Sequence, residues 1–526
     1  MRNYLSRASV AVLFILTSCS VNYEVETGQS ADDSSVWRSS LYPADWQAGY
    51  SDEAGRFLHD FSYAGYQYGA SLPEHVEGLS VDVTAEPYSA DSTGVDDATK
   101  AIQSALDDVG MAGGGVVYLP AGTYRIRPEA GRESVLKLRY SGVVLRGAGA
   151  GKTFIFNDSY QMRGITVIDA QPFVETSWNA DGRDVAGLAL AEDCVEPSFE
   201  ISLVDVSGLK VGDSIVIRND LTQRFIDHIG MTGKWEPAQS RNRTLTYFRR
   251  IVDIDTTTGV VRLDIPTRGH LFTADKARVV ALKGQMLEEV GVEDLSIGMK
   301  AHPGEGLGMR DFLTPGTVAY DVHDSCAIEF SYVENAWVRG VHSYAPAGNT
   351  PKVHLLSHGI KLMRSRGVTV VDCELKFPQY HGEGGNGYLY MLHGQDNLIV
   401  DCSGEGGRHN YSFGTMSASG NVIVDCESKD GRLPSDFHMF LSLANLLDNM
   451  TRDGDYLEAR AIRPWGGKVM HGVTTTESVF WNTHGVRYAP TRDYLVFSHQ
   501  QGEGYVIGTR GPADQVDSSD FVEGVG

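Results

Sequence analysis

The sequence repeats itself between His381 and Met450 with a period that few folds can accommodate. Asn397 opens the phrase NLIVDC, Asn421 opens NVIVDC and Asn445 opens NLLDN, so that successive copies lie 24 residues apart. Short β-branched runs bounded by Asn, Asp and Gly, repeated at such a spacing, are typical of stacked parallel strands in which each repeat forms one coil. The sequence therefore predicts a right-handed, single-stranded parallel β-helix.

Three cysteines occupy the same position in successive repeats, namely Cys373, Cys402 and Cys426. We expect them to stack inward as small apolar side chains. Because half of the 6 cysteines of the chain belong to this ladder, we expect no disulfide framework.

The chain opens with a basic start, a short apolar run and the tetrapeptide LTSC, which ends at Cys19. This pattern predicts a signal peptide over residues 1–18. The tetrapeptide resembles the bacterial lipobox, which implies cleavage before Cys19 and a lipid anchor on its thiol. Ser20 after the cysteine resembles sorting to the outer membrane of a Gram-negative bacterium. An ordinary secretory signal is the alternative, and no other stretch reaches the roughly 18 apolar residues of a spanning helix.

Beyond the signal peptide we expect two regions, a tether and one solenoid domain. Residues 19–45 are polar and aperiodic, which is typical of a flexible tether, and residues 46–526 form the predicted β-helix. At about 198–283 the repeat gives way to alternating apolar and polar residues around Gly turns, which indicates an inserted antiparallel β segment. The net charge of −23 argues against nucleic acid as a partner.

The segment YSADSTGVDDATKAIQSALDDVGMAGGGVVYLPAGTYRI, residues 88–126, combines a short amphipathic helix with two strands around a Pro-Ala-Gly turn. It closely resembles the opening of proteins of the pectate-lyase-like superfamily, in which a short helix caps the first coil of a right-handed β-helix. The resemblance implies a carbohydrate-active protein with a polysaccharide or oligosaccharide as its partner. Members of that superfamily include lyases, hydrolases, transglycosidases, epimerases and phage tailspikes, so that fold alone does not choose a chemistry.

If the 24-residue register holds, corresponding residues of successive coils stack about 4.8 Å apart on one face. One predicted ladder consists of His358, Tyr388, Ser412 and Asp436. The neighbouring one consists of Ile360, Tyr390, Gly414, His438 and His471. Unpaired polar side chains are costly in a core, so we expect these ladders to line an outward groove in which Gly414 leaves room for a sugar ring.

The residues of this groove form two predicted groups. The catalytic candidates are His438, Arg408, Asp436, Tyr388 and His409. The candidates for substrate binding are His358, Tyr390, His381, Glu383, Arg432, Glu458, Arg460 and His471.

The favoured chemistry is β-elimination on a glycan that contains uronic acid. An arginine such as Arg408 would neutralise the carboxylate, a tyrosine or histidine would remove the adjacent proton, and a second such group would protonate the leaving oxygen. Glycoside hydrolysis or transglycosylation is the alternative, with Asp436 and a second carboxylate from Glu383 or Glu458 flanking the bond. A glycan-binding solenoid without catalysis is the third hypothesis.

We expect no metal and no other cofactor. No zinc-binding motif with HExxH or paired CxxC spacing occurs. Calcium, which related lyases often use, needs converging carboxylates. The adjacent-coil pair Asp401 and Asp425 lies in the VDC turns, where structural aspartates are common.

Overall fold

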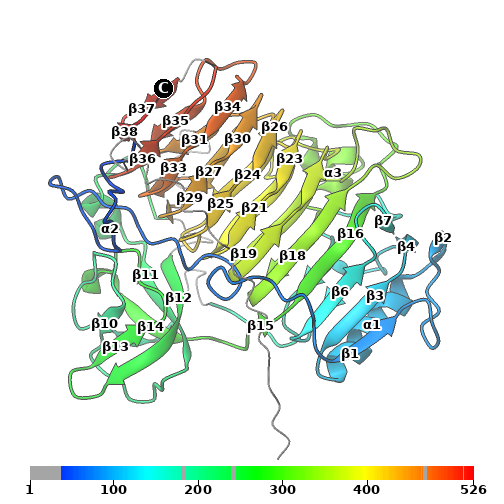
Figure 1. The fold of residues 1–526 in the computed structure, drawn as a ribbon, viewed down its shortest axis with the longest axis horizontal. Helices are drawn as coiled ribbons and strands as arrows, with labels where there is room; N and C mark the ends of the chain where they lie inside the picture. Colours follow the sequence, from blue (N-terminus) through cyan, green and yellow to red (C-terminus); the bar gives the residue numbers. More distant parts are fainter. Residues whose placement is uncertain are drawn as a thin grey trace, which may run out of the picture.

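A computed structural model describes residues 37–178, 185–237, 244–463, 465, 471–512 and 515–525. Within these residues the chain winds into a parallel β-helix whose coils each contribute strands to three parallel stacks (Figure 1). Parallel crossovers of this kind are right-handed in nearly all proteins. The predicted fold class is confirmed.

Stack 1 contains the strands that end at the VDC phrases of the repeat. Its strands are β1 (Leu79–Asp82), β3 (Gly115–Leu119), β6 (Val143–Gly147), the start of β16 (Gly291–Met299), the middle of β18 (Val333–Ser343), the end of β19 (His358–Val371), β22 (Leu398–Val400), β25 (Val422–Val424), β29 (Leu446–Asp448), β33 (Val479–Trp481), β36 (Tyr505–Ile507) and β38 (Phe521–Glu523). Two-residue β15 (Leu287–Glu288) pairs with the start of β18.

Stack 2 follows a tight turn after each strand of stack 1. It contains β2 (Thr93–Asp97), β4 (Gly122–Ile126), β7 (Thr153–Asn157), the ends of β16 and β18, β20 (Glu374–Lys376), β23 (Ser403–Glu405), β26 (Glu427–Lys429), β30 (Thr451–Asp453) and β34 (His484–Arg487).

Stack 3 completes each coil and runs back toward stack 1. It contains β5 (Ser134–Leu138), β8 (Thr166–Ala170), β17 (Cys326–Ser331), the start of β19, β21 (Tyr388–Gln395), β24 (His409–Gly414), β27 (Ser435–Met439), β31 (Leu457–Arg460), β35 (Val496–His499) and β37 (Val516–Ser518). The short strands β28 (Ser442–Leu443) and β32 (Thr475–Thr476) pair at the corner between stacks 3 and 1.

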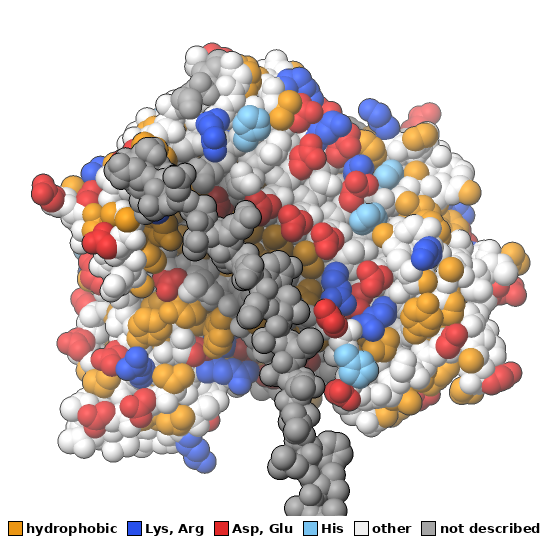
Figure 2. All heavy atoms as spheres, viewed as in Figure 1, with side chains coloured by type: hydrophobic (Ala, Val, Ile, Leu, Met, Phe, Trp, Pro, Cys, Tyr) orange, Lys and Arg blue, Asp and Glu red, His pale blue; other side chains and the backbone are white. Residues whose placement is uncertain are grey.

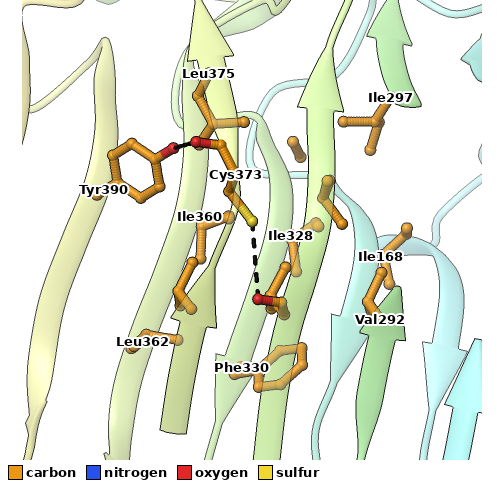
Figure 3. Packing of buried hydrophobic residues seen from close by; sticks show 14 of the residues in the cluster. Ile168, Val292, Ile297, Ile328, Phe330, Ile360, Leu362, Cys373, Leu375 and Tyr390 are labelled. Carbon is orange, nitrogen blue, oxygen red and sulfur yellow. Dashed lines mark hydrogen bonds between the residues drawn. The ribbon is translucent and has the colours of Figure 1, made fainter. Parts of the chain in front are cut away.

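The core fills the space between the three stacks with aligned apolar side chains. Ile168, Ile328 and Ile360 occupy one register position of successive coils of stack 3, and Tyr390 follows them (Figure 3). All four are buried, and the hydroxyl of Tyr390 donates to the carbonyl oxygen of Cys373 at 3.0 Å. Tyr390 was predicted to bind substrate, and this prediction is wrong for the described conformation because its ring belongs to the core.

The helix α1 (Thr99–Met111) covers the first coil at the N-terminal end of the solenoid (Figure 1). Its buried residues Ile102, Ala105, Leu106 and Val109 join the main core. A solenoid requires such a cap because its first coil would otherwise expose an apolar layer.

The three asparagines that mark the repeat form a continuous buried ladder. The Nδ2 amide of Asn397 donates to Oδ1 of Asn421 at 2.9 Å, and that of Asn421 donates to Oδ1 of Asn445 at 2.8 Å. Asn421 also donates to the carbonyl oxygen of Gly394 at 3.0 Å and accepts from the amide of Asn397 at 3.1 Å. The ladder thus satisfies backbone groups at the corner where a β-sheet cannot.

An antiparallel sheet stands beside the solenoid as an insert. It comprises β9 (Leu188–Ala189), β10 (Glu200–Ser202), β11 (Ser214–Asp220), β12 (Thr244–Asp255), β13 (Val260–Leu263) and β14 (Arg278–Ala281), in the order β10-β13-β12-β11-β14-β9, with α2 (Gln223–His228) and the 3₁₀ turn Thr273–Asp275. The sheet begins with β9, ten residues before the predicted boundary at 198. The prediction missed this start because a two-residue strand is too short to show an alternating pattern.

The insert is joined to the corner between stacks 3 and 1. Apolar residues of the insert share a core with Met416, Leu441 and Val473 of the solenoid. Beside them the buried carboxylate of Asp396 accepts from Arg268 at 3.0 Å and lies 3.4 Å from Arg249.

Residues 37–78 run along the outside of the solenoid from its C-terminal coils to the region of the cap (Figure 1). Leu41 is fully buried with Val479, Tyr505 and Ile507, and the amide of Ser40 donates to Glu523 at 2.9 Å. The end of the predicted tether, residues 37–45, is therefore packed on the body of the protein, because Leu41 fills a space among the last coils. Residues 1–36, which include Cys19, lie outside the described part, and no described helix has the length and apolar character needed to cross a membrane.

We expect Asn421→Ala to lower the free energy of unfolding by about 3 kcal/mol, because it leaves the buried amide of Asn397 and carbonyl of Gly394 without their partner. Chemical denaturation followed by circular dichroism measures the change. The control is Glu427→Ala on an exposed position of β26, for which the expected change is within about 0.5 kcal/mol. Equal stability of the two variants would contradict the role given to the ladder.

Candidate active site

The outward face of stack 3 contains a column of side chains, polar except at one position, that crosses β19, β21, β24, β27 and β31. In strand register this column consists of Lys361, Met391, Ser412, Asp436 and Glu458. The pairing of Ser412 with Asp436 agrees with the predicted ladder.

The predicted ladders fail at three other steps. Tyr388 pairs with His409 rather than with Ser412, and Tyr390 pairs with Tyr411 rather than with Gly414, because this coil contains 21 residues rather than 24. Gly414 pairs with Met439 rather than with His438, because a bulge follows Phe413. Bulges redirect side chains, and this one leaves His438 as the extra residue, facing Tyr388 across the intervening coil.

Tyr388, His438 and Asp436 form a hydrogen-bonded chain. The hydroxyl of Tyr388 lies 3.2 Å from Nε2 of His438, and Nδ1 of His438 lies 2.9 Å from Oδ2 of Asp436. Because a carboxylate only accepts, the tautomer that satisfies Asp436 carries its proton on Nδ1, and in this tautomer Nε2 accepts from the phenol. The chain is thus arranged to pass a proton from Tyr388 to His438.

Asp436 is the fixed negative end of this chain. Its carboxylate accepts from Ser412 Oγ at 3.0 Å and from Arg463 Nη1 at 2.7 Å. Burial alone would raise the pKa of Asp436, but its interactions with His409, His438 and Arg463, which include the hydrogen bond from His438, hold this pKa well below its usual range. Asp436 therefore stays ionised while fully buried.

The two other members of the chain are neutral at neutral pH. Burial lowers the pKa of His438 to about 4, with Asp436 raising it and Arg463 lowering it. Burial also raises the pKa of Tyr388 well above its usual range. A neutral histidine can accept a proton and a protonated phenol can donate one, so both groups are in the form that proton transfer along the chain requires.

His409 lies behind this chain rather than in the groove. Its ring is fully buried, its centroid is 4.8 Å from that of Tyr388, and its Nδ1 donates to the carbonyl oxygen of Pro434 at 2.6 Å. The predicted catalytic residue His409 is therefore placed to support the ring of Tyr388.

Arg408 is the half-buried cation next to the chain. One of its nitrogens donates to the carbonyl oxygen of Gly382 at 2.6 Å, and its charge lowers the pKa of Tyr388 against the larger effect of burial. Among the residues that the structure describes, Arg408 has no carboxylate partner, whereas Arg463 is bound to Asp436. Arg408 thus has a positive charge left for an anionic ligand.

The remaining predicted residues surround the chain at different distances. Arg432 donates to the carbonyl oxygen of His381 at 2.8 Å and so holds the loop that also contains Glu383, which is half exposed. The ring of His471 is 5.3 Å from that of His438.

Two further pairs of polar side chains border the site, one at each side. Glu458 is paired with Arg460 at 2.7 Å. His358 lies 3.2 Å from Asp324 and accepts from the backbone amide of Tyr388 at 3.3 Å.

One functional candidate, His393, was absent from the residues that the sequence placed at the groove. Arg463 was expected around the groove from the segment YLEARAIRP, but it was given no role there. His393 is two residues after Met391 on the same outward face, and alternation along β21 is the signal that could have found it.

A metal ion would find a possible donor set at His409, Asp436 and His438, whose ligand atoms lie within 4.8 Å of one another. Arg463 Nη1 already lies 2.7 Å from Asp436 Oδ2 and 2.8 Å from His438 Nδ1. A guanidinium therefore supplies the positive charge at this point, and the absence of a metal or other cofactor stays a prediction.

Residues 82–186 match the family model described as rhamnogalacturonase A/epimerase, pectate lyase-like. The chain has the fold of the pectate-lyase-like superfamily. Mannuronan C5-epimerase AlgE6 of Azotobacter vinelandii is 41% identical over 107 residues, which are 20% of this chain and 12% of that protein. Alginate lyase 7 of the same organism is 37% identical over 75 residues, which are 14% of this chain and 9% of that protein.

Among solved structures, the A-module of AlgE6 aligns over 84% of this chain and 97% of that module, with 13% identity and a TM-score of 0.31. The tailspike of E. coli bacteriophage HK620, solved with a pentasaccharide, aligns over 82% of this chain and 58% of that chain, with 11% identity and a TM-score of 0.44. These likenesses add nothing to the chemistry of the site.

We expect Arg463→Met to raise the pKa of His438 above its value of about 4, because the charge of Arg463 lowers this pKa. Stability should fall by about 3 to 5 kcal/mol, since the buried charge of Asp436 loses its partner. Titration of labelled histidine rings by nuclear magnetic resonance measures the pKa. Arg132→Met, at an exposed arginine, is the control, and a His438 pKa that stays near 4 in Arg463→Met would contradict this account of the site.

Proposed function

We propose that the chain is an enzyme that modifies a uronic-acid polysaccharide by removing the C5 proton next to the carboxylate. The observation that carries the proposal is the Tyr388–His438–Asp436 chain beside the unpaired charge of Arg408. The similarity to mannuronan C5-epimerases and an alginate lyase supports a mannuronan-type polymer as the substrate.

The step follows from the charges at the site. Arg408 binds the carboxylate of the uronate, which makes the adjacent C5 proton more acidic and stabilises the negative charge that develops when it leaves. The oxygen of Tyr388 takes the C5 proton while its own phenolic proton moves to Nε2 of His438. Asp436 then stabilises the imidazolium ion, as a carboxylate does in a catalytic triad.

Two products can follow from the same intermediate. In β-elimination the C4–O4 bond breaks, a double bond forms between C4 and C5, and the leaving oxygen takes a proton, which Tyr388 can return. In epimerisation a proton is delivered to the opposite face of C5 and no bond of the polymer breaks. The enzyme is therefore proposed as a polysaccharide lyase or a C5-epimerase.

Glycoside hydrolysis, the alternative, requires one carboxyl group that can give a proton. Asp436 is held ionised by buried donors, and Glu458 is paired with Arg460. Glu383 lies on a loop and is half exposed near Arg310. None of the three is a shielded, unpaired acid, so the geometry favours proton abstraction. A purely glycan-binding face would have no need of a buried proton-transfer chain.

We further propose that the mature protein is extracytoplasmic and lipid-anchored at Cys19, in the outer membrane of a Gram-negative bacterium. The support is the sequence that ends at Cys19. Mass spectrometry of the protein purified from membranes should find residues 1–18 removed and Cys19 acylated. A mature protein that starts elsewhere or carries no lipid would contradict the anchor.

We expect Tyr388→Phe and Arg408→Ala to reduce turnover of mannuronan by about 10² to 10⁴, since each removes a group that acts in proton abstraction. Ultraviolet absorbance detects the unsaturated uronate that elimination forms, and proton nuclear magnetic resonance detects inverted C5 centres. The matched control is Tyr390→Phe, whose hydroxyl is bonded inside the core and whose loss should leave turnover unchanged.

Full activity in both Tyr388→Phe and Arg408→Ala would show that the site lies elsewhere. New reducing ends without unsaturation would replace proton abstraction with hydrolysis.

A further inference from the structure

His393 is a buried histidine at the edge of the site with unused hydrogen-bonding capacity. It lies on β21, two residues after Met391, and its side chain is 8% exposed. Within the described part of the chain no group donates to or accepts from its ring. Buried polar groups usually have a protein partner, so a ligand is a natural partner for this one.

The charges around His393 keep its ring neutral. Burial is the main influence that lowers the pKa of His393 to about 3, and the cations of Lys361 and Arg364 and the rings of His438 and His358 act in the same direction. A neutral imidazole has one N–H donor and one acceptor nitrogen. This pair suits a sugar hydroxyl, whereas a carboxylate is better bound by an arginine.

Gly414 occupies the facing position on the next coil of stack 3. A Cβ atom at residue 414 would lie 2.6 Å from Nε2 of His393, which is too close for two unbonded atoms. The backbone of Gly414 does not have a positive φ, so any residue could adopt its conformation. The ring of His393 is therefore the contact that requires glycine at this position.

The direction of the ring relates His393 to the reacting groups. Its Nε2 is aimed at the coil of Gly414, which separates β21 from β27, where the bulge places His438. Tyr388 is the first residue of the strand that contains His393, and its hydroxyl reaches across that same coil to His438. The unpaired nitrogen is thus directed at the same coil that the Tyr388 hydroxyl crosses to reach His438.

We propose that His393 is a specificity-determining residue that hydrogen-bonds a hydroxyl of the sugar held at Tyr388, and that Gly414 is glycine in order to seat its ring. This inference rests on the proposed function, because it takes Tyr388 as the position of the reacting sugar. It differs from the sequence-based expectation that Gly414 leaves room for the sugar itself.

A double-mutant cycle separates these two explanations of the glycine. Gly414→Ala turns the flexible ring of His393 away, so we expect kcat/KM on mannuronan to fall about tenfold, as for the loss of one hydrogen bond. In a His393→Ala background the same change should cost less than about twofold, because the ring is already absent. An equal cost in both backgrounds would show that the methyl group meets the sugar and would overturn the proposal.

A binding measurement gives a readout that does not depend on turnover. In the Tyr388→Phe background, His393→Phe should raise the Kd for a mannuronate tetrasaccharide about tenfold by calorimetry, and His393→Gln, which keeps a donor and an acceptor, should raise it less. Thermal unfolding of each variant separates a loss of binding from a loss of fold. An unchanged Kd in a folded His393→Phe variant would overturn the proposal.

The two proposals fail in different ways. If Tyr388→Phe and Arg408→Ala abolish turnover while the His393 and Gly414 variants retain it, only the inference on His393 is wrong. If the tetrasaccharide does not bind and mannuronan is not turned over, the proposed function is wrong and the inference falls with it.

Discussion

Parallel hydrogen bonding between successive coils is the constraint on which the rest of the structure depends. Each coil fixes the height and register of the next, so that a residue's place on the surface follows from the length of the coil before it. For this reason Asp436 pairs with Ser412 of the preceding coil and with Glu458 of the following coil. A site built on such strands is rigid, because moving one side chain along the axis would require moving a whole coil.

This constraint explains how far the sequence could predict the structure. The fold, the asparagine ladder and the pairing of Ser412 with Asp436 follow from the regular 24-residue step. The step fails between Tyr388 and His409, where a shorter coil leaves no mark in the repeat, and at His438, where one bulged residue shifts the register. These two irregularities bring Tyr388 close to His438. The repeat therefore failed to predict the pairing at the positions that form the site.

The direction of each side chain was harder to predict than its position. Tyr390 was placed in the groove because the 24-residue step aligned it with Gly414, but it stacks on Tyr411 in the core with ring centroids 4.8 Å apart. Its hydroxyl reaches two backbone carbonyl oxygens, which satisfies it without solvent. A tyrosine can thus belong to either face, and only the packing of neighbouring coils decides which.

The N-terminal segment that runs outside the solenoid changes how the molecule can come apart. A repeat protein whose coils contact only their neighbours can lose its terminal coils one at a time. Here Tyr66 packs on Trp337 near the cap, with ring centroids 5.4 Å apart, while Leu41 is buried among the last coils. Fraying at either end must release part of the same segment, so the two ends are mechanically linked and the coils should melt together rather than in sequence.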